Sequence, residues 1–310
     1  MKKWSICRLA AILILLTQNK ILAQELELIK TTRLTHYPSA SAIEFYNNRL
    51  FIIGDDAASL IIVDKEHQEV DSVRLFPGNE ARIHKDEKAD LEASVLLNEG
   101  GKNYLLALSS LSTEKRNKIL LFDLDNKQFK IQNLQLAHLQ LDEINIEGAA
   151  LVNGHLVLSN RANNTSRINH LVVSRFEIEK GELSKNEKII TLLLPQKKMV
   201  TGVSGLAYSN EKDVLFFTAS TENTADAVSD GEIGESYIGY ISGIRNKLNN
   251  KEIKADTLIQ LSSLFAAKIP QKIESLAIEE EKKNELIFHL VADNDNGEST
   301  LFKMKMKWKD

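Results

Sequence analysis

Residues 272–307, KIESLAIEEEKKNELIFHLVADNDNGESTLFKMKMK, contain the pattern that decides the fold. A short strand begins near Glu274 and ends at a charged turn, and the apolar run 286–291 predicts a buried second strand. An Asp/Asn/Gly loop leads to residues 300–307, whose alternation of apolar and polar residues predicts a third strand. The same order of elements recurs upstream, so the stretch is one unit of a repeated architecture.

Four upstream segments repeat this plan. Each unit begins with a strand rich in small residues and continues with an apolar strand and a more alternating one. The units begin at Ser41, Glu92, Glu147, Ser204 and Glu274. A fourth, more polar strand follows in the first four units, at residues 69–76, 127–136, 187–194 and 254–261. Four strands per unit, graded from apolar to amphipathic, are typical of a β-propeller blade.

The sequence therefore predicts an all-β fold, a β-propeller of five four-stranded blades. The last unit lacks a fourth strand, and residues 25–34 have the character to supply it and close the ring. A count of six stays open, because a degenerate blade could lie in residues 77–89 or 221–235. Residues 262–268 form the one plausible helical segment. A pair of β-sandwiches would have strands at similar spacing, but it gives no reason for one acidic position to recur.

The first 23 residues have the layout of a secretory signal peptide, which leaves residues 24–310 as a single propeller domain. The apolar run 9–16 is shorter than the ~20 residues that a membrane span needs, and an uncleaved anchor is the alternative. We therefore expect an exported protein, periplasmic or extracellular, with no membrane span after signal cleavage. Cys7, the only cysteine, would leave with the signal, so no disulfide is expected.

Removal of this segment takes away four basic residues and no acidic residue, so the formal net charge falls from −4 to −8. An acidic domain is a poor candidate for nucleic-acid binding, which needs clustered positive charge. We expect a monomer whose partner is a small molecule or a component of the cell envelope.

The blade plan predicts which side chains meet at the propeller axis. The first strand of each blade begins, and the second ends, at the same face of the ring. The expected first-strand members are Asp90, Glu92, Glu147, Ser204, Lys272 and Glu274, with Ser41 in the first blade. The expected second-strand members are Asp55, Asp56, Asn160, Arg161, Glu222, Asn223, Asp293, Asn294 and Asp295. The sequence therefore predicts an acid-rich funnel around the axis.

Crowded carboxylates need counter-charges or must take up protons. Arg161 and Lys272 can neutralise only part of this set. Calcium accepts Asp, Glu and Asn oxygens in irregular geometry, so calcium is the expected cation. The seven histidines are scattered and no cysteine lies in the domain, which argues against zinc or copper.

Structural roles compete with this interpretation. Inner-strand glutamates such as Glu92, Glu147 and Glu274 can simply accept backbone hydrogen bonds or pair with an arginine of the next blade. The segment Asp293-Asn-Asp-Asn-Gly297 has alternating acids like a calcium loop, but it is equally compatible with a hairpin turn. The pair Asp55-Asp56 can likewise be a turn between two apolar strands.

Several short motifs resemble the repeated motifs of the phytase-like β-propeller proteins, which include bacterial exported proteins grouped as having "esterase-like activity of phytase". The motifs are Asp90-Leu-Glu-Ala93, Ile146-Glu-Gly-Ala149 with Leu158-Ser-Asn-Arg161, and Ile273-Glu-Ser-Leu-Ala277 with Ala292-Asp-Asn-Asp295. The resemblance covers roughly residues 39–307. It implies a calcium-dependent propeller whose axial carboxylates bind metal and, in true phytases, a phosphorylated substrate.

On that analogy the candidate metal ligands are Glu92, Glu147, Glu274, Asp293 and Asp295, and the rim position of Asp56 adds a sixth. Arg161 and Lys272 would face a phosphate, with Asn160 beside them. The sequence departs from the pattern in three ways. It lacks the N-terminal acidic motif of genuine phytases, it carries Ser41 and Ser204 in place of Glu, and it has five countable blades where those phytases have six.

Two functions follow from this reading. The favoured one is a non-catalytic exported propeller whose funnel binds a cation, a sugar or a partner protein, because the sequence supplies few cations for catalysis. The alternative is a calcium-dependent hydrolase of phosphate or carboxylate esters. In that alternative Glu147 or Glu274 would act as general base, and Arg161 would stabilise developing charge.

Overall fold

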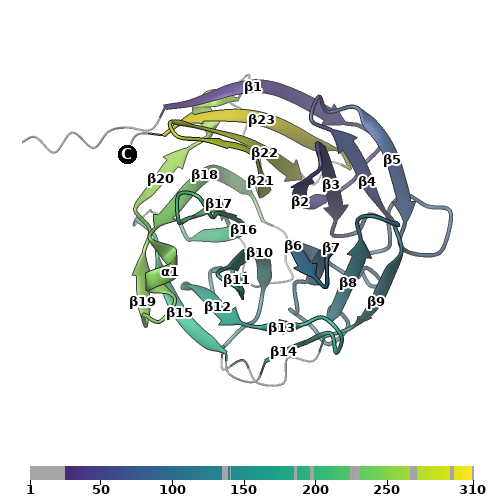
Figure 1. Cartoon of the computed structure of the whole chain (residues 1–310), viewed down its shortest axis with the longest axis horizontal. Helices are drawn as coiled ribbons and strands as arrows, with labels where there is room; N and C mark the ends of the chain where they lie inside the picture. The colour runs from purple at the N-terminus through teal and green to yellow at the C-terminus, as the bar shows by residue number, and fades with distance from the viewer. Residues whose placement is uncertain are drawn as a thin grey trace, which may run out of the picture.

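The computed structural model of the protein describes residues 25–134, 139, 141–184, 187–195, 199–223, 226, 231–265, 271–293 and 297–308. The described strands form five blades in a ring, so the predicted β-propeller is confirmed and the sandwich alternative is excluded (Figure 1). The expected signal peptide lies outside the described residues. Within the described part, no helix is long and apolar enough to cross a membrane.

The strands of each blade run outward from the axis, and in the first four blades the innermost four follow chain order. Blade one contains β2 (Ala40–Tyr46), β3 (Arg49–Gly54), β4 (Ser59–Asp64) and β5 (Glu69–Arg74). Blade two contains β6 (Leu91–Glu99), β7 (Lys102–Ser109), β8 (Lys118–Asp123) and β9 (Phe129–Asn133). Blade four contains β16 (Thr201–Ser209), β17 (Val214–Glu222), β18 (Ile233–Ser242) and β20 (Thr257–Gln260).

Blade three is larger than the others. It contains β10 (Ile146–Val152), β11 (His155–Asn160), β12 (Asn169–Ser174) and β15 (Lys188–Leu193). A fifth strand, β19 (Glu252–Lys254), adds in parallel to β15, and the hairpin of β13 (Phe176–Glu177) and β14 (Glu182–Leu183) lies between β12 and β15 in the chain. The short helix α1 (Ile244–Lys247) precedes β19. The repeat pattern predicts neither the fifth strand nor α1.

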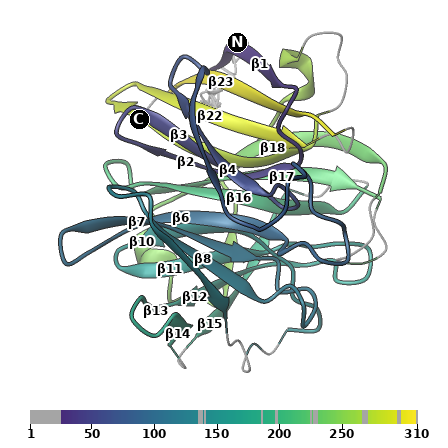
Figure 2. The same ribbon diagram turned by 90° about the vertical axis from the view of Figure 1, so that its right-hand side faces the viewer.

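Blade five closes the ring. It contains β21 (Ile273–Lys282), β22 (Glu285–Asp293), β23 (Ser299–Lys307) and, as its outer strand, β1 (Glu25–Leu34). β1 pairs antiparallel with β23 from Glu25 opposite Lys307 to Leu34 opposite Ser299. Figure 2 shows the two strands side by side at one edge of the ring. The predicted closure by residues 25–34 is therefore confirmed.

Five apolar clusters form the core, one between each pair of neighbouring blades. Because every blade is covered on both faces, its second strand is a continuous apolar run, and all of β17 is buried. Small residues allow the inner strands to approach one another. A Cβ atom on Gly148 would lie 2.2 Å from the carbonyl oxygen of Ser204, and one on Gly205 would lie 2.6 Å from Cα of Ser275.

The long insertions do not form a sixth blade in the described residues. The segment 77–89, which is described throughout, contains a single bridge, Ala57 to Arg82, and no strand. The segment 221–235 contributes to the ends of β17 and β18, and part of it lies outside the described residues. The expected helical segment is a 3-10 turn, Ser262–Leu264.

Candidate functional site

The inner strands of the five blades pack around the axis, and charged side chains gather where these strands begin. β2, β6, β10, β16 and β21 each contact the inner strands of both neighbouring blades. Glu92, Glu147 and Glu274 lie near the starts of β6, β10 and β21, and the structure brings all three to the same end of the axis. Ser204 takes the equivalent place on β16 and donates a hydrogen bond to the carbonyl oxygen of Ile273.

The first group of charges, the Arg161 cluster, contains three glutamates and two cations: Glu147, Glu222, Glu274, Arg161 and Lys272. Arg161 Nη1 lies 3.1 Å from Glu147 Oε2, and Nη2 lies 2.9 Å from Glu222 Oε2. Lys272 Nζ lies 3.1 Å from Glu274 Oε1 and 3.6 Å from Glu222 Oε1. The two cations therefore join carboxylates of blades three, four and five.

Glu274 is the weakly satisfied member of this cluster. Its Oε2 accepts no hydrogen bond from the described residues, and the 3.7 Å distance to Arg161 Nη1 is too long for one. Burial raises the pKa of Glu274 to about 8, although Lys272 and Arg161 oppose the shift. Burial therefore favours the neutral form of Glu274, against the attraction of the two cations.

The second group, the Lys88 cluster, contains Asp55, Asp90, Glu92, Lys88 and Arg116. Lys88 Nζ forms an ion pair with Asp55 Oδ2 and lies 2.8 Å from Asp90 Oδ1. Arg116 Nη1 lies 3.1 Å from Asp90 Oδ2. The backbone N–H of Asp90 donates to the carbonyl oxygen of Asp55 at 3.1 Å, which fixes blade two against blade one.

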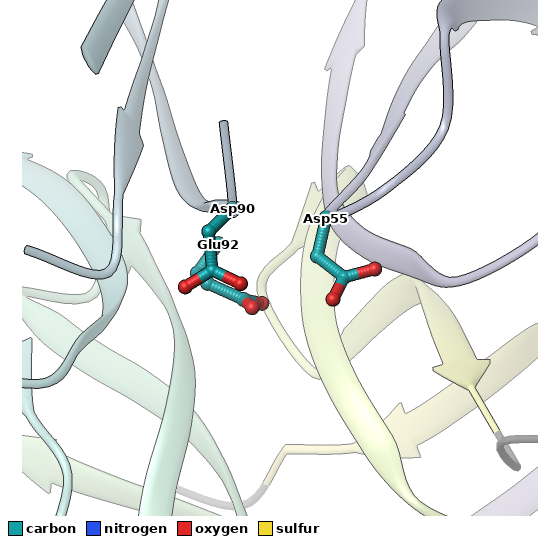
Figure 3. Close-up of side chains that lie close together, drawn as sticks. All are labelled: Asp55, Asp90 and Glu92. Carbon is teal, nitrogen blue, oxygen red and sulfur yellow. The ribbon is translucent and has the colours of Figure 1, made fainter. Parts of the chain in front are cut away.

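The three carboxylates of the Lys88 cluster converge. One oxygen of each of Asp55, Asp90 and Glu92 lies within 4.8 Å of the other two, and Figure 3 shows the carboxylates of blade two facing that of blade one. Glu92 forms no ion pair with a cation of the described chain. Burial raises the pKa of Glu92 well above its usual range, and Asp90, Asp55 and Glu147 raise it further.

The residues present fit a hard cation. Asp55 Oδ1 is buried without a hydrogen-bond partner among the described residues, and carboxylate oxygens are the ligands that calcium prefers. Lys88 competes for the same oxygens, because its ammonium already contacts Asp55 and Asp90. Asp55 and Lys88 line a groove of about 420 Å³ together with Asp56, Arg82 and Asp293, so the cluster reaches a groove on its Asp55 side.

Not all of the predicted site residues join these clusters. Asp56 forms an ion pair with Arg82 and accepts a hydrogen bond from Ser39, while Asp293 lines the groove. The Asn160 side chain accepts from the backbone N–H of Asn145 at 2.7 Å and donates to the carbonyl oxygen of Glu143 at 3.1 Å.

Asp295 lies outside the described residues. Among the six predicted metal ligands, Glu92 is the one that the described chain places in the converging triad.

Sequence reasoning missed Lys88 and Arg116, the two cations of the Lys88 cluster. Neither residue belongs to a periodic pattern. Lys88 lies near the end of the insertion 77–89, and the sequence does not predict where that insertion runs. The segment returns to blade one through backbone hydrogen bonds, from Ala58 to Ala81 and from Ile83 to Asp56, and this places Lys88 over Asp55. The proximity of Lys88 to Asp90 in the chain was the only available signal.

Comparison with other proteins supports the fold and leaves the activity open. No curated protein sequence matches the chain. The sequence matches the family described as "Family of unknown function (DUF6929)" over residues 36–306. The structure is similar to the glutaminyl cyclase of Myxococcus xanthus, with 12% sequence identity, coverage of 93% of this chain and 98% of that one, and a TM-score of 0.53.

The structure is also similar to the tail fiber of Staphylococcus aureus phage P68, with 11% identity, coverage of 93% of this chain and 54% of that one, and a TM-score of 0.50. At identities this low the two likenesses show a shared fold alone.

Proposed function

This chain belongs to that family of unknown function, and from the geometry of its axial site we propose a non-catalytic, exported β-propeller that binds calcium at the Lys88 cluster. The observation that carries the proposal is the convergence of three carboxylate oxygens within 4.8 Å beside a buried, unpartnered Asp55 Oδ1. The resemblance of the Asp90-Leu-Glu-Ala93 motif to those of phytase-like propellers supports the same ion.

Charge balance supports calcium binding at this cluster. With all three acids ionised, Asp55, Asp90 and Glu92 carry one more charge than Lys88 and Arg116 neutralise. Burial, and then Asp90 and Asp55, raise the pKa of Glu92, so the cluster opposes this third negative charge. Calcium would supply the missing positive charge and take the place of the Lys88 ammonium, with Asp55, Asp90 and Glu92 as its protein ligands.

The state of the Arg161 cluster supports binding over catalysis. Arg161 is buried and already forms ion pairs with Glu147, Glu222 and Glu274. A guanidinium that is shared among three carboxylates is poorly placed to take up a substrate phosphate, because the substrate would have to displace them. This cluster is therefore better suited to holding three blades together.

Calcium titration of the full-length protein by calorimetry tests the proposal. We expect a single strong site in the wild type and a rise in melting temperature of about 5 °C when calcium exceeds its dissociation constant ~100-fold. Asp90→Asn should abolish both effects, and Lys88→Met should tighten binding because it removes the competing ammonium. Lys130→Gln, an exposed lysine on the outer strand of blade two, is the matched control and should leave the affinity unchanged.

The affinity should also increase with pH, because calcium displaces the proton on Glu92. No heat of binding and no melting shift in wild type or Lys88→Met would exclude calcium. Tight binding that survives Asp90→Asn would exclude this cluster as the site.

A second candidate function, a hydrolase of phosphate or carboxylate esters, has one observation in its favour. Glu274 has a pKa of about 8 beside Glu147 and Arg161, and a buried protonated carboxyl can act as a general acid. Lys272 and Asn160 would then assist substrate binding. Assays with phytate, nitrophenyl phosphates and nitrophenyl acyl esters test it, and turnover must be lost in Glu274→Gln for these residues to be responsible.

A further inference from the structure

A groove of about 670 Å³ lies on blade three, between the β13–β14 hairpin and helix α1. We call it the blade-three groove, and the lining residues that matter are His155, Arg175, Phe176, Lys188, Arg245 and Asn249. Asn153, in the turn that follows β10, and His155, the first residue of β11, line one side. Because Glu147 lies at the opposite end of β10, the groove opens away from the axial charge clusters. The hairpin and α1 are additions to the plain four-stranded blade (Figure 1).

The lining is basic although the chain as a whole is acidic. Arg175, Lys188, Arg245 and His155 line the groove, while Glu177 is its one acidic lining residue. Glu177 is not available to neutralise them, since its Oε2 lies 2.5 Å from Nζ of Lys180, which does not line the groove.

Two of these cations have no carboxylate partner among the described residues. Lys188 Nζ donates to the amide oxygen of Asn249, and Arg175 is exposed and forms no side-chain ion pair with the described chain. Arg245 is different, because it lies 3.5 Å from Asp213 and donates to the Tyr208 hydroxyl. A chain with 43 acidic and 39 basic residues thus leaves Arg175 and Lys188 uncompensated in one concave surface.

The rest of the lining suits a polar, ring-shaped molecule. The half-buried Ser184 and the exposed Asn249 supply a hydroxyl and an amide group, and the half-buried Phe176 supplies an aromatic face. The volume falls within the range of about 300–1,000 Å³ that is common for small-molecule sites. We infer that the blade-three groove binds an anionic sugar, with Arg175 and Lys188 on the anionic group and Ser184 and Asn249 on sugar hydroxyls.

The anionic group can be a carboxylate or a sulfate, and calorimetry with three probes distinguishes them: glucuronate, glucose 6-sulfate and neutral glucose. We expect at least one of the two anions to bind at low ionic strength and glucose to bind at least ~10-fold more weakly. Binding should weaken as salt is raised, because Arg175 and Lys188 are exposed. The anion that binds more tightly identifies the ligand class.

Substitutions then assign the site. Arg175→Gln and Lys188→Gln should each weaken the anion about two- to fivefold, and the double variant about tenfold or more. Lys130→Gln, an exposed lysine on the outer strand of blade two, is the matched control and should have no effect. All three positions are exposed, so circular dichroism should confirm that the variants fold.

Failure of both anions to bind the wild-type protein at concentrations up to roughly 50 mM would overturn the inference. So would binding that the double variant leaves unchanged, or glucose binding as tightly as the anions. Asp90→Asn, which tests the calcium site, should not alter binding of the anions to the blade-three groove, so each proposal is tested independently of the other.

Discussion

Two charge clusters of the same composition, three carboxylates and two cations, adjoin at one end of the propeller axis and differ in the reach of their central cation. Arg161 forms ion pairs with all three glutamates of its cluster. Lys88 forms ion pairs with the two aspartates of its cluster, and Glu92 has no cation partner in the described chain. A guanidinium offers several donors in one plane, whereas an ammonium is a point charge.

The comparison teaches where a propeller of this kind can hold a ligand. A cluster in which every carboxylate has a cation partner stabilises the junction of the blades, even though Glu274 Oε2 accepts no hydrogen bond from the described residues. A cluster with one unengaged carboxylate and one unpartnered aspartate oxygen retains the capacity to take up a cation. The following predictions test this division, from the largest expected effect to the smallest.

Arg161→Met should be the most destabilising substitution. It leaves Glu147, Glu222 and Glu274 close together with Lys272 as their remaining cation, and removal of one partner from a buried ionic network typically costs about 3–5 kcal/mol. Urea denaturation measures the loss in the free energy of unfolding. Calcium should not restore it. A variant within about 1 kcal/mol of wild type would show that Arg161 is not the structural cation of the axis.

Lys88→Met should cost less, about 2 kcal/mol without calcium, because Arg116 still pairs with Asp90. Unlike Arg161→Met, it should recover most of this stability when calcium is added, since the ion can replace the lost ammonium. Parallel melts in calcium and in chelator check the result. If calcium raised the melting temperature of the two variants equally, the proposed difference between the clusters would be wrong.

Glu274→Gln should change the pH dependence of stability. The folded protein holds the proton up to a pKa of about 8, whereas the unfolded chain releases it near 4.5, so this group makes stability decrease as pH rises between those values. The amide cannot ionise, so the variant should lack this component, a slope of up to about 1 kcal/mol per pH unit. Denaturation at a series of pH values gives the slopes, and identical slopes would show that Glu274 is ionised when folded.

Arg82→Gln should have the smallest effect, about 0.5 kcal/mol. The Arg82 side chain is 54% exposed, so its ion pair with Asp56 is screened by solvent. Asp56 also keeps the hydrogen bond from Ser39 after the substitution. A loss comparable to that of Arg161→Met in the same denaturation experiment would mean that solvent exposure does not weaken the Arg82–Asp56 pair.

The sequence predicts the blades well because their chemistry is periodic. The apolar second strand of each unit follows from its burial between two neighbours, and the small residues of the first strand follow from contacts such as that of Gly148 with Ser204. The register of the acidic position follows from the repeat, so Glu92, Glu147 and Glu274 could be placed at one end of the axis before any coordinates.

The counter-charges could not be predicted in the same way. Lys88 reaches the axis from a loop without periodicity, and Arg116 lies between β7 and β8 in a segment that the repeat does not constrain. Which carboxylates share a cation depends on these loops. For the same reason the additions to blade three, on which the blade-three groove depends, carry no signal in the repeat pattern.

The pairing of β1 with β23 makes closure of the ring depend on strands that lie far apart in the chain. Glu25 and Lys307, which form an ion pair across this junction, are separated by 282 positions, so β1 stays unpaired until β23 has been synthesised. A product cut short before β23 would leave both β1 and the edge of β22 unpaired, and unpaired strand edges promote association between chains. Truncated copies should therefore aggregate and not persist as smaller rings.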